Sequence, residues 1–285
     1  MGLRKEYKPS AWIRIGLLVL LLVVVVWATS CGLGASAKEK KQNWRPTEEI
    51  ATMERLLQVA LAPVGNTMYI WGGGWESEDT KTESTATQIG MPKLWAEFAK
   101  VQTGDYNFKE FLEQEGSQTM GLDCSGYVGW VMYNLFHQKD DEEGYVCKST
   151  ELSAKLAERG WGKLIQNPKD FLAGDIVSME GHVWICLGTC QDNSVLLVHS
   201  SPPGVSVCGT ISPEGEGNTS LAIRLATEYM SSNHPQWQER YPNRTVPATY
   251  LEDVTLFRWN SETLKNAKNY QEKTAEEIME LLDSF

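Results

Sequence analysis

The chain has 285 residues, a hydrophobic fraction of 42% and a net charge of −11. This length suffices for one sizeable domain or two small ones, and the hydrophobic fraction is ordinary for a globular protein. The acidic balance argues against a nucleic-acid partner, because phosphate binding needs a basic surface.

Residues 1–37 have the pattern of a membrane-directed segment. Basic residues near the start precede an uncharged stretch over residues 15–37, which is long enough to span a bilayer or to serve in a secretory signal. Residues 35–37 offer a cleavage site, and Cys31 would be the acylated residue of a lipoprotein. A cleaved signal, a retained membrane anchor and a lipoprotein therefore all stay open. In each case the positive-inside rule places residues 38–285 outside the cytoplasm, either secreted or held at the membrane by the N-terminal segment alone.

Helical patterns dominate the first half of the chain. Residues 68–71 look extended, and the glycines at 72–74 let the backbone turn tightly or approach a ligand. Residues 75–120 are polar and mixed, and we interpret them as an insertion. The predicted helices cover residues 47–62, 91–101, 124–136 and 150–159.

Short apolar and β-branched runs dominate the second half. Gly, Pro, Asn and Asp separate them, which is typical of an antiparallel meander. Residues 211–250 form a second irregular insertion with a helical piece at 221–230, and residues 261–285 are charged and favour a helix. Helices first and strands second predict an α+β fold. The predicted strands cover residues 175–179, 182–187, 195–199, 205–208 and 254–259.

A candidate nucleophile lies at the start of the predicted helix 124–136. Cys124 stands between Asp123 and the pair Ser125-Gly126, where a loop turns into an apolar, helix-compatible run. A thiol in this position feels the positive end of the helix dipole, which is expected to lower its pKa and favour the thiolate. Asp123 is also a candidate helix cap.

Two histidines downstream of Cys124 lie in strand-like settings. His182 follows a glycine and begins the run Val-Trp-Ile, and His199 ends the run Val-Leu-Leu-Val. A cysteine followed by two histidines provides a nucleophile, a general base and a group that orients the base. His137, at the far end of the helix, and His234, in the second insertion, are expected to be structural or surface residues.

The remaining cysteines leave their pairing open. An odd number of cysteines after residue 37 leaves at least one thiol free outside the cell. If Cys124 is the nucleophile, the other four could pair or could be buried free thiols. A zinc site at Cys186 and Cys190 is not favoured, because no second ligand pair lies close by. We expect no metal and no organic cofactor. The four other cysteines are Cys147, Cys186, Cys190 and Cys208.

Five short motifs resemble, in order, those of the NlpC family, the papain-like cysteine peptidases of bacterial cell walls. The resemblance covers roughly residues 50–210 and the strand near 254–259. Each motif alone is weak, and the five in the correct order are strong. The motifs are Tyr69-Ile70-Trp71-Gly72-Gly73, Asp123-Cys124-Ser125-Gly126, Gly174-Asp175-Ile176-Val177, Gly181-His182-Val183 and Val198-His199-Ser200-Ser201.

The resemblance implies a papain-like α+β domain over residues 38–285, with the nucleophile helix packed on a small antiparallel sheet. It also implies a Cys-His-His triad of Cys124, His182 and His199. The implied substrate is the stem peptide of peptidoglycan, cut between γ-D-glutamate and the diamino acid. The oxyanion is expected at the backbone N–H groups that begin the helix.

Substrate binding is expected near the nucleophile. In relatives, the residues matching Tyr69 and Asp123 help to hold the free amine of the stem, and Ser125 is a third candidate. The long gap between Gly74 and Asp123 and the insertion at 211–250 depart from the family pattern.

Two alternatives to the peptidase stay open. An amidase or acyltransferase on the same scaffold would pass the acyl group to another acceptor. A catalytically silent wall-binding protein would keep the fold without turnover. The sequence does not indicate an oligomeric state.

Overall fold

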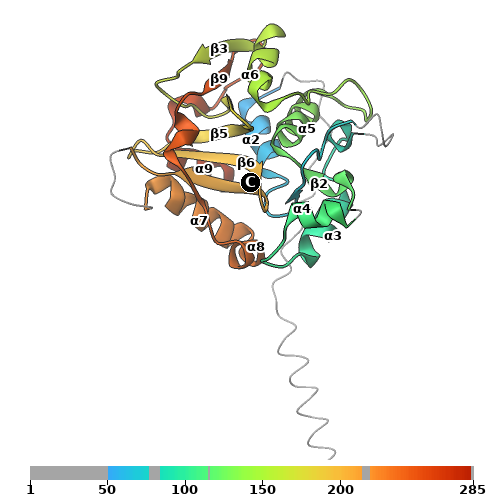
Figure 1. Cartoon of the computed structure of the whole chain (residues 1–285). Helices are drawn as coiled ribbons and strands as arrows, with labels where there is room; N and C mark the ends of the chain where they lie inside the picture. The colour runs from blue at the N-terminus through green and yellow to red at the C-terminus, as the bar shows by residue number, and fades with distance from the viewer. Residues whose placement is uncertain (1–50, 77–83, 115, 214–218, 284–285) are drawn as a thin grey trace, which may run out of the picture. The chain divides into compact units, whose positions relative to one another are not determined.

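Helices dominate the first half of the described chain and strands dominate the second (Figure 1). This computed structural model describes residues 51–76, 84–114, 116–213 and 219–283, all within the unit 44–285. The helices in these ranges are α2 (Met53–Leu61), α3 (Lys93–Val101), α4 (Phe108–Glu113), α5 (Cys124–Phe136), α6 (Ser149–Glu158), α7 (Leu221–Asn233), α8 (Pro235–Arg240) and α9 (Ala275–Asp283). The strands are β1 (Met68–Tyr69), β2 (Gly121–Leu122), β3 (Gly162–Gln166), β4 (Ile176–Met179), β5 (His182–Thr189), β6 (Val195–Ser201), β7 (Gly204–Thr210), β8 (Thr245–Val246) and β9 (Thr255–Trp259). The fold is therefore α+β, as predicted.

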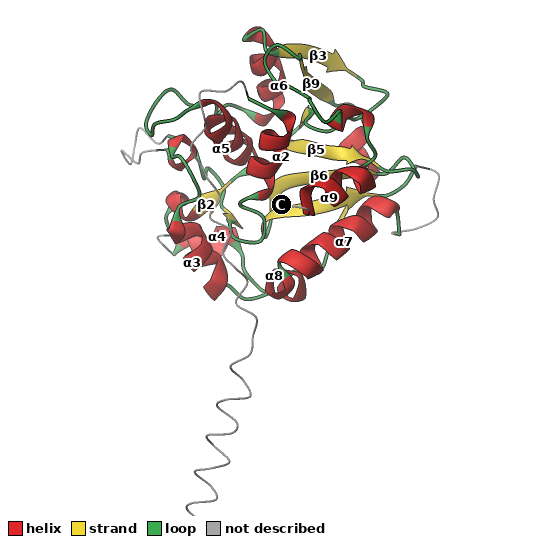
Figure 2. Ribbon diagram, turned by 180° about the vertical axis from the view of Figure 1, so that it is seen from behind, coloured by secondary structure: helices red, strands yellow, loops and turns green. Residues whose placement is uncertain are grey.

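The strands form one curled sheet in the order β2-β1-β7-β6-β5-β4-β9-β3, with β8 beside β7. From β7 to β3, every neighbouring pair is antiparallel. The pairs β1–β2 and β7–β8 are parallel. Helices α5, α7 and α9 pack along the central strands, which Figures 1 and 2 show from opposite sides.

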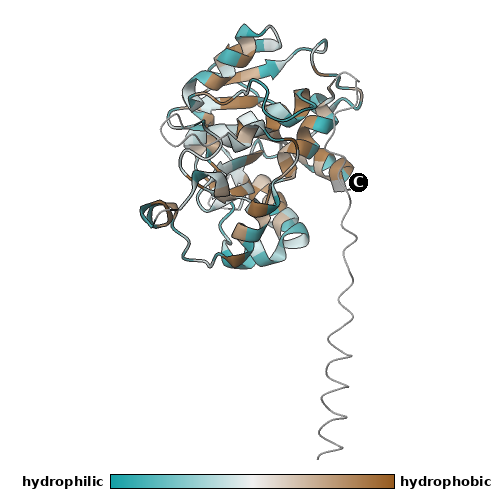
Figure 3. Ribbon diagram, turned by 90° about the vertical axis from the view of Figure 1, so that its right-hand side faces the viewer, coloured by the Kyte–Doolittle hydropathy of each residue, from teal (hydrophilic) through white to brown (hydrophobic). Residues whose placement is uncertain are grey.

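Side chains alternate between the two faces of the sheet, and each face has its own core. Along β5, Val183, Ile185 and Leu187 belong to the larger core, which also contains apolar residues of α2, α5 and α7. Trp184 and Cys186 belong to a smaller core on the other face. This period of two is that of a strand buried on both sides. Figure 3 shows brown, apolar stretches on the strands and mixed teal and brown stretches along the helices.

Most predicted elements are present. The five predicted strands correspond to β4, β5, β6, β7 and β9, and the predicted helices correspond to α2, α3, α5, α6 and α7. The helix expected over 261–285 is wrong in extent, since it begins only at Ala275. Asn260 and Asn266 accept hydrogen bonds from backbone N–H groups three and four residues further along, and such bonds favour turns over helix. The sequence did not predict β2, β3, β8, α4 or α8.

The predicted signal or anchor at residues 1–37 lies outside the described residues. Within the described ranges, no helix combines the length and the apolar character that crossing a bilayer requires. The choice between a cleaved signal, an anchor and a lipoprotein therefore stays open.

The segment after β9 folds back onto the start of α2. The Met53 N–H donates to the Lys265 carbonyl at 2.9 Å, and the Lys265 N–H donates to the Ala51 carbonyl at 2.9 Å. Helix α2 in turn contacts α5, because the buried Tyr127 hydroxyl donates to the Ala60 carbonyl at 2.8 Å. The start of the described chain and the segment after β9 are thus joined beside the helix that begins at Cys124.

The glycine-rich turn at residues 72–74 lies against the first turn of α5. Gly72 and Gly74 have φ values of 78° and 93°, in the left-handed region that glycine adopts without strain. The Asp123 N–H donates to the Gly73 carbonyl at 3.0 Å. A Cβ placed on Gly126 would lie 1.9 Å from the same carbonyl oxygen, so only glycine fits there.

We predict that Gly126→Ala destabilises the fold. The added methyl group would collide with backbone, which cannot move aside as a flexible side chain can. The expected loss in the free energy of unfolding is about 1–3 kcal/mol or more, the usual cost of overpacking. Chemical denaturation of both proteins measures it, with the exposed Thr150→Ala on α6 as a control that should stay near wild type. Equal stability of Gly126→Ala and wild type would contradict this packing.

Candidate active site

The Asp123 side chain holds the first turn of α5. Its Oδ1 accepts hydrogen bonds from the Gly126 N–H at 2.7 Å and the Ser125 hydroxyl at 2.9 Å. Its Oδ2 accepts from the Gly72 N–H at 3.1 Å. The Trp75 indole N–H completes the network by donating to the Ser125 hydroxyl oxygen at 3.1 Å. Asp123 is therefore the cap of α5, and it also fastens the glycine-rich turn to the helix.

Cys124, the first residue of α5, is buried at 8% exposure. Burial is the main reason that the pKa of its thiol is raised to about 11, and the negative charge of Asp123 raises it further. Hydrogen bonds from the backbone N–H groups of Val183, Ser125 and Cys124 itself act in the opposite direction. The expectation that the helix start would lower this pKa is thus wrong, because lost hydration of the thiolate outweighs the dipole. The resting group is a thiol, which needs a base to become a nucleophile.

His182 and His199 form a hydrogen-bonded pair. His182 Nε2 and His199 Nδ1 are 2.9 Å apart. Burial lowers the pKa of His182 to about 4, and the pKa of His199 lies well below its ordinary value because of burial, His182 and Arg244. Both rings are therefore neutral at pH 7, and one nitrogen of the pair donates while the other accepts. The Nδ1 atom of His182 takes no part in this bond and is available to a different partner.

The start of β5 brings His182 to Cys124. Strands β5 and β6 pair from Ile185 opposite Val198 to Thr189 opposite Val195. The Val183 N–H therefore has no register partner in β6, and it lies close enough to the Cys124 thiol to favour the thiolate. His182 is the residue next to Val183, so the thiol lies beside the backbone that carries the histidine.

Strand β6 is also held close to Cys124 by a hydrogen bond. The buried Ser200 hydroxyl donates to the Leu122 carbonyl at 2.7 Å. This bond joins the residue after His199 to the short strand that leads into Cys124. The structure thus gathers the three predicted residues of the triad at one end of the central strands.

The sequence missed a segment that covers the two histidines. The Tyr250 ring centroid lies 5.4 Å from that of His182 and 5.9 Å from that of His199. Arg244, at 3% exposure, lowers the pKa of His199 through its positive charge. Its Nε and Nη1 atoms find no hydrogen-bond partner among the described residues. Both residues come from the predicted insertion 211–250, where no motif or periodicity distinguishes them.

The three predicted substrate-binding residues surround the thiol. Tyr69 is buried, and burial followed by the nearby Cys124 and Asp123 raises the pKa of its hydroxyl. The hydroxyl of Ser125 is already engaged by Asp123 and Trp75. The side chains of Asp123 and Ser125 therefore hold the loop together, whatever contact they make with a substrate.

His137 and His234 make their contacts elsewhere, whereas Cys208 lies close enough to Arg244 and Tyr250 to interact with both electrostatically. His137 bonds Glu142 and the Tyr145 hydroxyl, the latter at 2.9 Å, and His234 packs against Gly65. Cys147, Cys186, Cys190 and Cys208 are free thiols, as is Cys124. In the described ranges, no group of three or more His, Cys, Asp or Glu residues could hold a metal ion.

The raised pKa of the Cys124 thiol predicts slow alkylation at neutral pH. The rate with iodoacetamide should climb steadily with pH toward a midpoint of about 11, since only the thiolate reacts. Rates should be followed by mass spectrometry of the Cys124 peptide, in a Cys147→Ser background that removes the half-exposed thiol. The urea-unfolded chain serves as control, with a midpoint near the ordinary value of about 8.5. An alkylation rate that is already maximal at pH 6–7 would show that Cys124 rests as the thiolate, which would contradict the raised pKa of its thiol.

No protein-family model, no curated protein and no solved structure matches this chain.

Proposed function

We propose that this chain is a papain-like cysteine endopeptidase of the NlpC type, which hydrolyses peptidoglycan stem peptides between γ-D-glutamate and the diamino acid. The observation that carries the proposal is the 2.9 Å bond between His182 and His199, next to a thiol at a helix start. The ordered motifs supply the substrate class. The N-terminal segment supports a place outside the cytoplasm, secreted or anchored and facing the cell wall.

The papain-like arrangement is part of this proposal. Helix α5 packs on an antiparallel sheet whose strands β5 and β6 carry the two histidines. Cys124 begins the helix, and His182 begins β5. These positions support the papain-like arrangement that we propose.

In the proposed reaction, Cys124 Sγ attacks the carbonyl carbon of the scissile amide. His182 takes the thiol proton at Nδ1, because its Nε2 is already bonded to His199. Neutral His182 suits this task, since a protonated imidazole has no free lone pair. The same proton then goes to the departing amine, and a thioester with Cys124 remains. Water, activated by His182, hydrolyses the thioester and restores the thiol.

His199 orients His182 and remains neutral throughout. With the base at Nδ1, His182 carries a proton on Nε2 and donates it to His199 Nδ1. The buried positive charge of Arg244 disfavours a second proton on His199. The proton taken from Cys124 therefore stays on His182, where it can reach the leaving amine.

The backbone at the start of α5 is the proposed oxyanion site. The Cys124 N–H belongs to the first turn, where backbone donors have no partner within the helix. Donors fixed in this way stabilise the negative oxygen of the tetrahedral intermediate.

Digestion of purified peptidoglycan, followed by mass analysis of the fragments, tests the function. Wild-type protein should release fragments cut between γ-D-glutamate and the diamino acid. Cys124→Ala and His182→Ala should abolish release, with losses of at least about 10²–10⁴-fold, while His199→Ala should lose less. Thermal melts of the variants serve as the folding control. Lytic activity that survives in folded Cys124→Ala would contradict the assignment, and fragments joined to a new acceptor would indicate an acyltransferase.

Asp123→Asn separates helix capping from recognition of a free amine. If the Asp123 carboxylate pairs with the stem amine, KM should rise more for a free-amine stem peptide than for its N-acetylated twin, because only the former is charged. The measurement is KM for both peptides with wild type and Asp123→Asn. The hydrogen bonds from Gly126, Ser125 and Gly72 show that the carboxylate has a structural role as well. Equal increases for both peptides would leave Asp123 as a cap alone.

Tyr250 is a positioning residue in this proposal, because its ring contacts both histidines. Since burial keeps the pKa of His182 at about 4, the acid limb of kcat/KM should lie near pH 4 in wild type. Tyr250→Ala should expose the two histidines to water. The acid limb of kcat/KM should therefore move up toward about pH 6.5, and kcat should fall about tenfold. Tyr250→Phe keeps the ring and should resemble wild type in both respects. An unmoved acid limb in Tyr250→Ala would exclude this role.

A further inference from the structure

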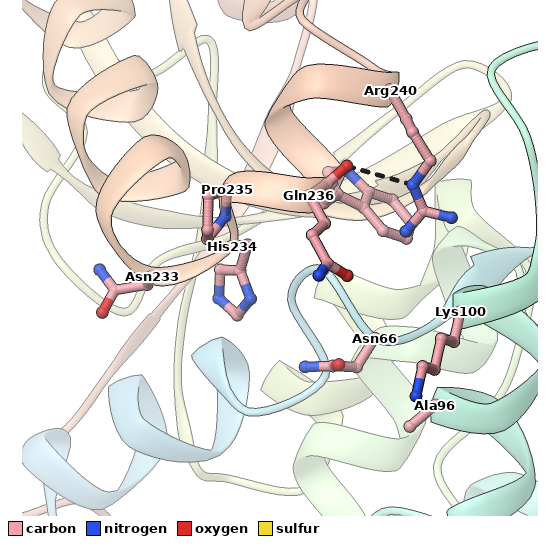
Figure 4. Close-up of a pocket in the computed structure, with 10 residues that line it drawn as sticks. Asn66, Ala96, Lys100, Asn233, His234, Pro235, Gln236 and Arg240 are labelled. Atoms are coloured by element: carbon pink, nitrogen blue, oxygen red, sulfur yellow. Dashed lines mark hydrogen bonds between the residues drawn. The ribbon is translucent and has the colours of Figure 1, made fainter. Parts of the chain in front are cut away.

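The two predicted insertions meet at a half-open pocket of about 400 Å³ (Figure 4). Ala96 and Lys100 of α3 line it from the insertion 75–120, and residues 233–237 and Arg240 line it from the insertion 211–250. Gly65 and Asn66, in the turn between α2 and β1, complete the wall. None of Cys124, His182 and His199 lines this pocket. Its size lies within the range of small-molecule sites.

Hydrogen bonds between the insertions fix the walls. The Arg240 guanidinium donates from Nη1 to the carbonyls of Ala99 and Gln102, at 2.9 and 2.5 Å. The Tyr241 hydroxyl donates to the Thr103 carbonyl at 2.6 Å. These bonds join α8 to the end of α3, so the pocket is formed in advance of any ligand.

The opposite wall is equally close-packed. A Cβ on Gly65 would lie 2.6 Å from the His234 ring, so the ring rests directly on this turn. Burial lowers the pKa of His234 to about 4, which leaves the ring neutral at pH 7. The fully buried Trp237 lies beneath.

The charge of the pocket is opposite to that of the chain. Lys100 and Arg240 are cationic, and none of the lining residues is acidic, although the whole chain carries −11. Arg240 is engaged by backbone carbonyls, which leave its positive charge uncompensated. The exposed Lys100 takes part in none of the ion pairs found among the described residues. A buried or half-enclosed cluster of this sign attracts an anion.

We propose that this pocket binds the carboxylate or phosphate of a small polar ligand, at a site separate from Cys124. Lys100 supplies the charge, and the Gln236 amide, which Figure 4 shows among the lining side chains, supplies hydrogen bonds to neutral polar groups of the ligand. A sugar acid or a sugar phosphate has this combination of one anionic group and several hydroxyls. The two insertions thus add a binding site to the chain, and this inference does not depend on the proposed peptidase activity.

Three sugars that differ in charge test the proposal. The full-length protein in detergent is titrated by calorimetry with N-acetylglucosamine, N-acetylmuramic acid and N-acetylglucosamine 6-phosphate. The first is neutral, the second carries a carboxylate and the third a phosphate. We expect at least one charged sugar to bind about tenfold or more tightly than the neutral one, with affinity falling as salt is added. Comparison of the two charged sugars tells carboxylate from phosphate.

Two charge reversals on α3 locate the site. Lys100→Glu should weaken binding of the charged sugar about tenfold or more, whereas Lys93→Glu, which is exposed on the same helix outside the pocket, should not. Cys124→Ala should bind as wild type does, which separates this site from hydrolysis. Equal affinity for all three sugars, no binding of either charged sugar, or equal losses in the two Lys variants would each overturn the proposal. None of these outcomes would bear on the peptidase.

Discussion

The carboxylate of Asp123 accepts hydrogen bonds from the first turn of α5 and from the glycine-rich turn that lies far away in the sequence. The position of the thiol depends on this contact, because it sets where α5 begins and which backbone faces Cys124. Gly126 is required for the same reason, since any side chain there would push the two segments apart. A carboxylate in such a place is costly to bury, and the hydrogen bonds that it accepts from backbone and Ser125 offset that cost.

Burial determines the chemistry of the proposed site more than any single charge does. It raises the pKa of the Cys124 thiol and lowers that of both histidines, so all three groups rest in their neutral forms. A neutral thiol beside a neutral imidazole requires proton transfer during the attack, in contrast to a preformed ion pair. The Tyr250 ring packs against His199, and the positive charge of Arg244 lowers the pKa of His199, so both residues strengthen this condition.

Local pattern was sufficient to predict the central strands, helix α5 and the α+β class. Each of these elements is defined by an apolar period, by β-branched runs or by a capping residue, all of which are local signals. The segment 261–274 was mistaken for helix because its composition favours helix, while the turns there depend on individual asparagine side chains. The extended segment expected at residues 68–71 contains β1, whereas the two-residue strand β2 is too short to give a periodic signal.

The sequence also indicated which cysteine and histidines to group, and the geometry brings them to one end of the sheet. It did not indicate Tyr250 or Arg244, whose proximity to His199 follows from long-range folding of the segment 241–251. It also did not indicate that burial would reverse the expected shift in the pKa of Cys124. That shift depends on how much water the neighbouring segments exclude from the thiol, which a local sequence motif does not reveal.

The return of the chain onto α2 limits how this protein can be trimmed or tagged. Lys265 shares two backbone hydrogen bonds with Ala51 and Met53, and the Lys268–Glu54 ion pair at 2.9 Å lies beside them. A truncation after Trp259 would remove this fastening and the cover that α9 places on β5. Because α2 contacts α5 through Tyr127, the loosening would reach the helix that begins at Cys124. The residues after β9 therefore contribute to the stability of the fold and cannot be removed without loosening α2.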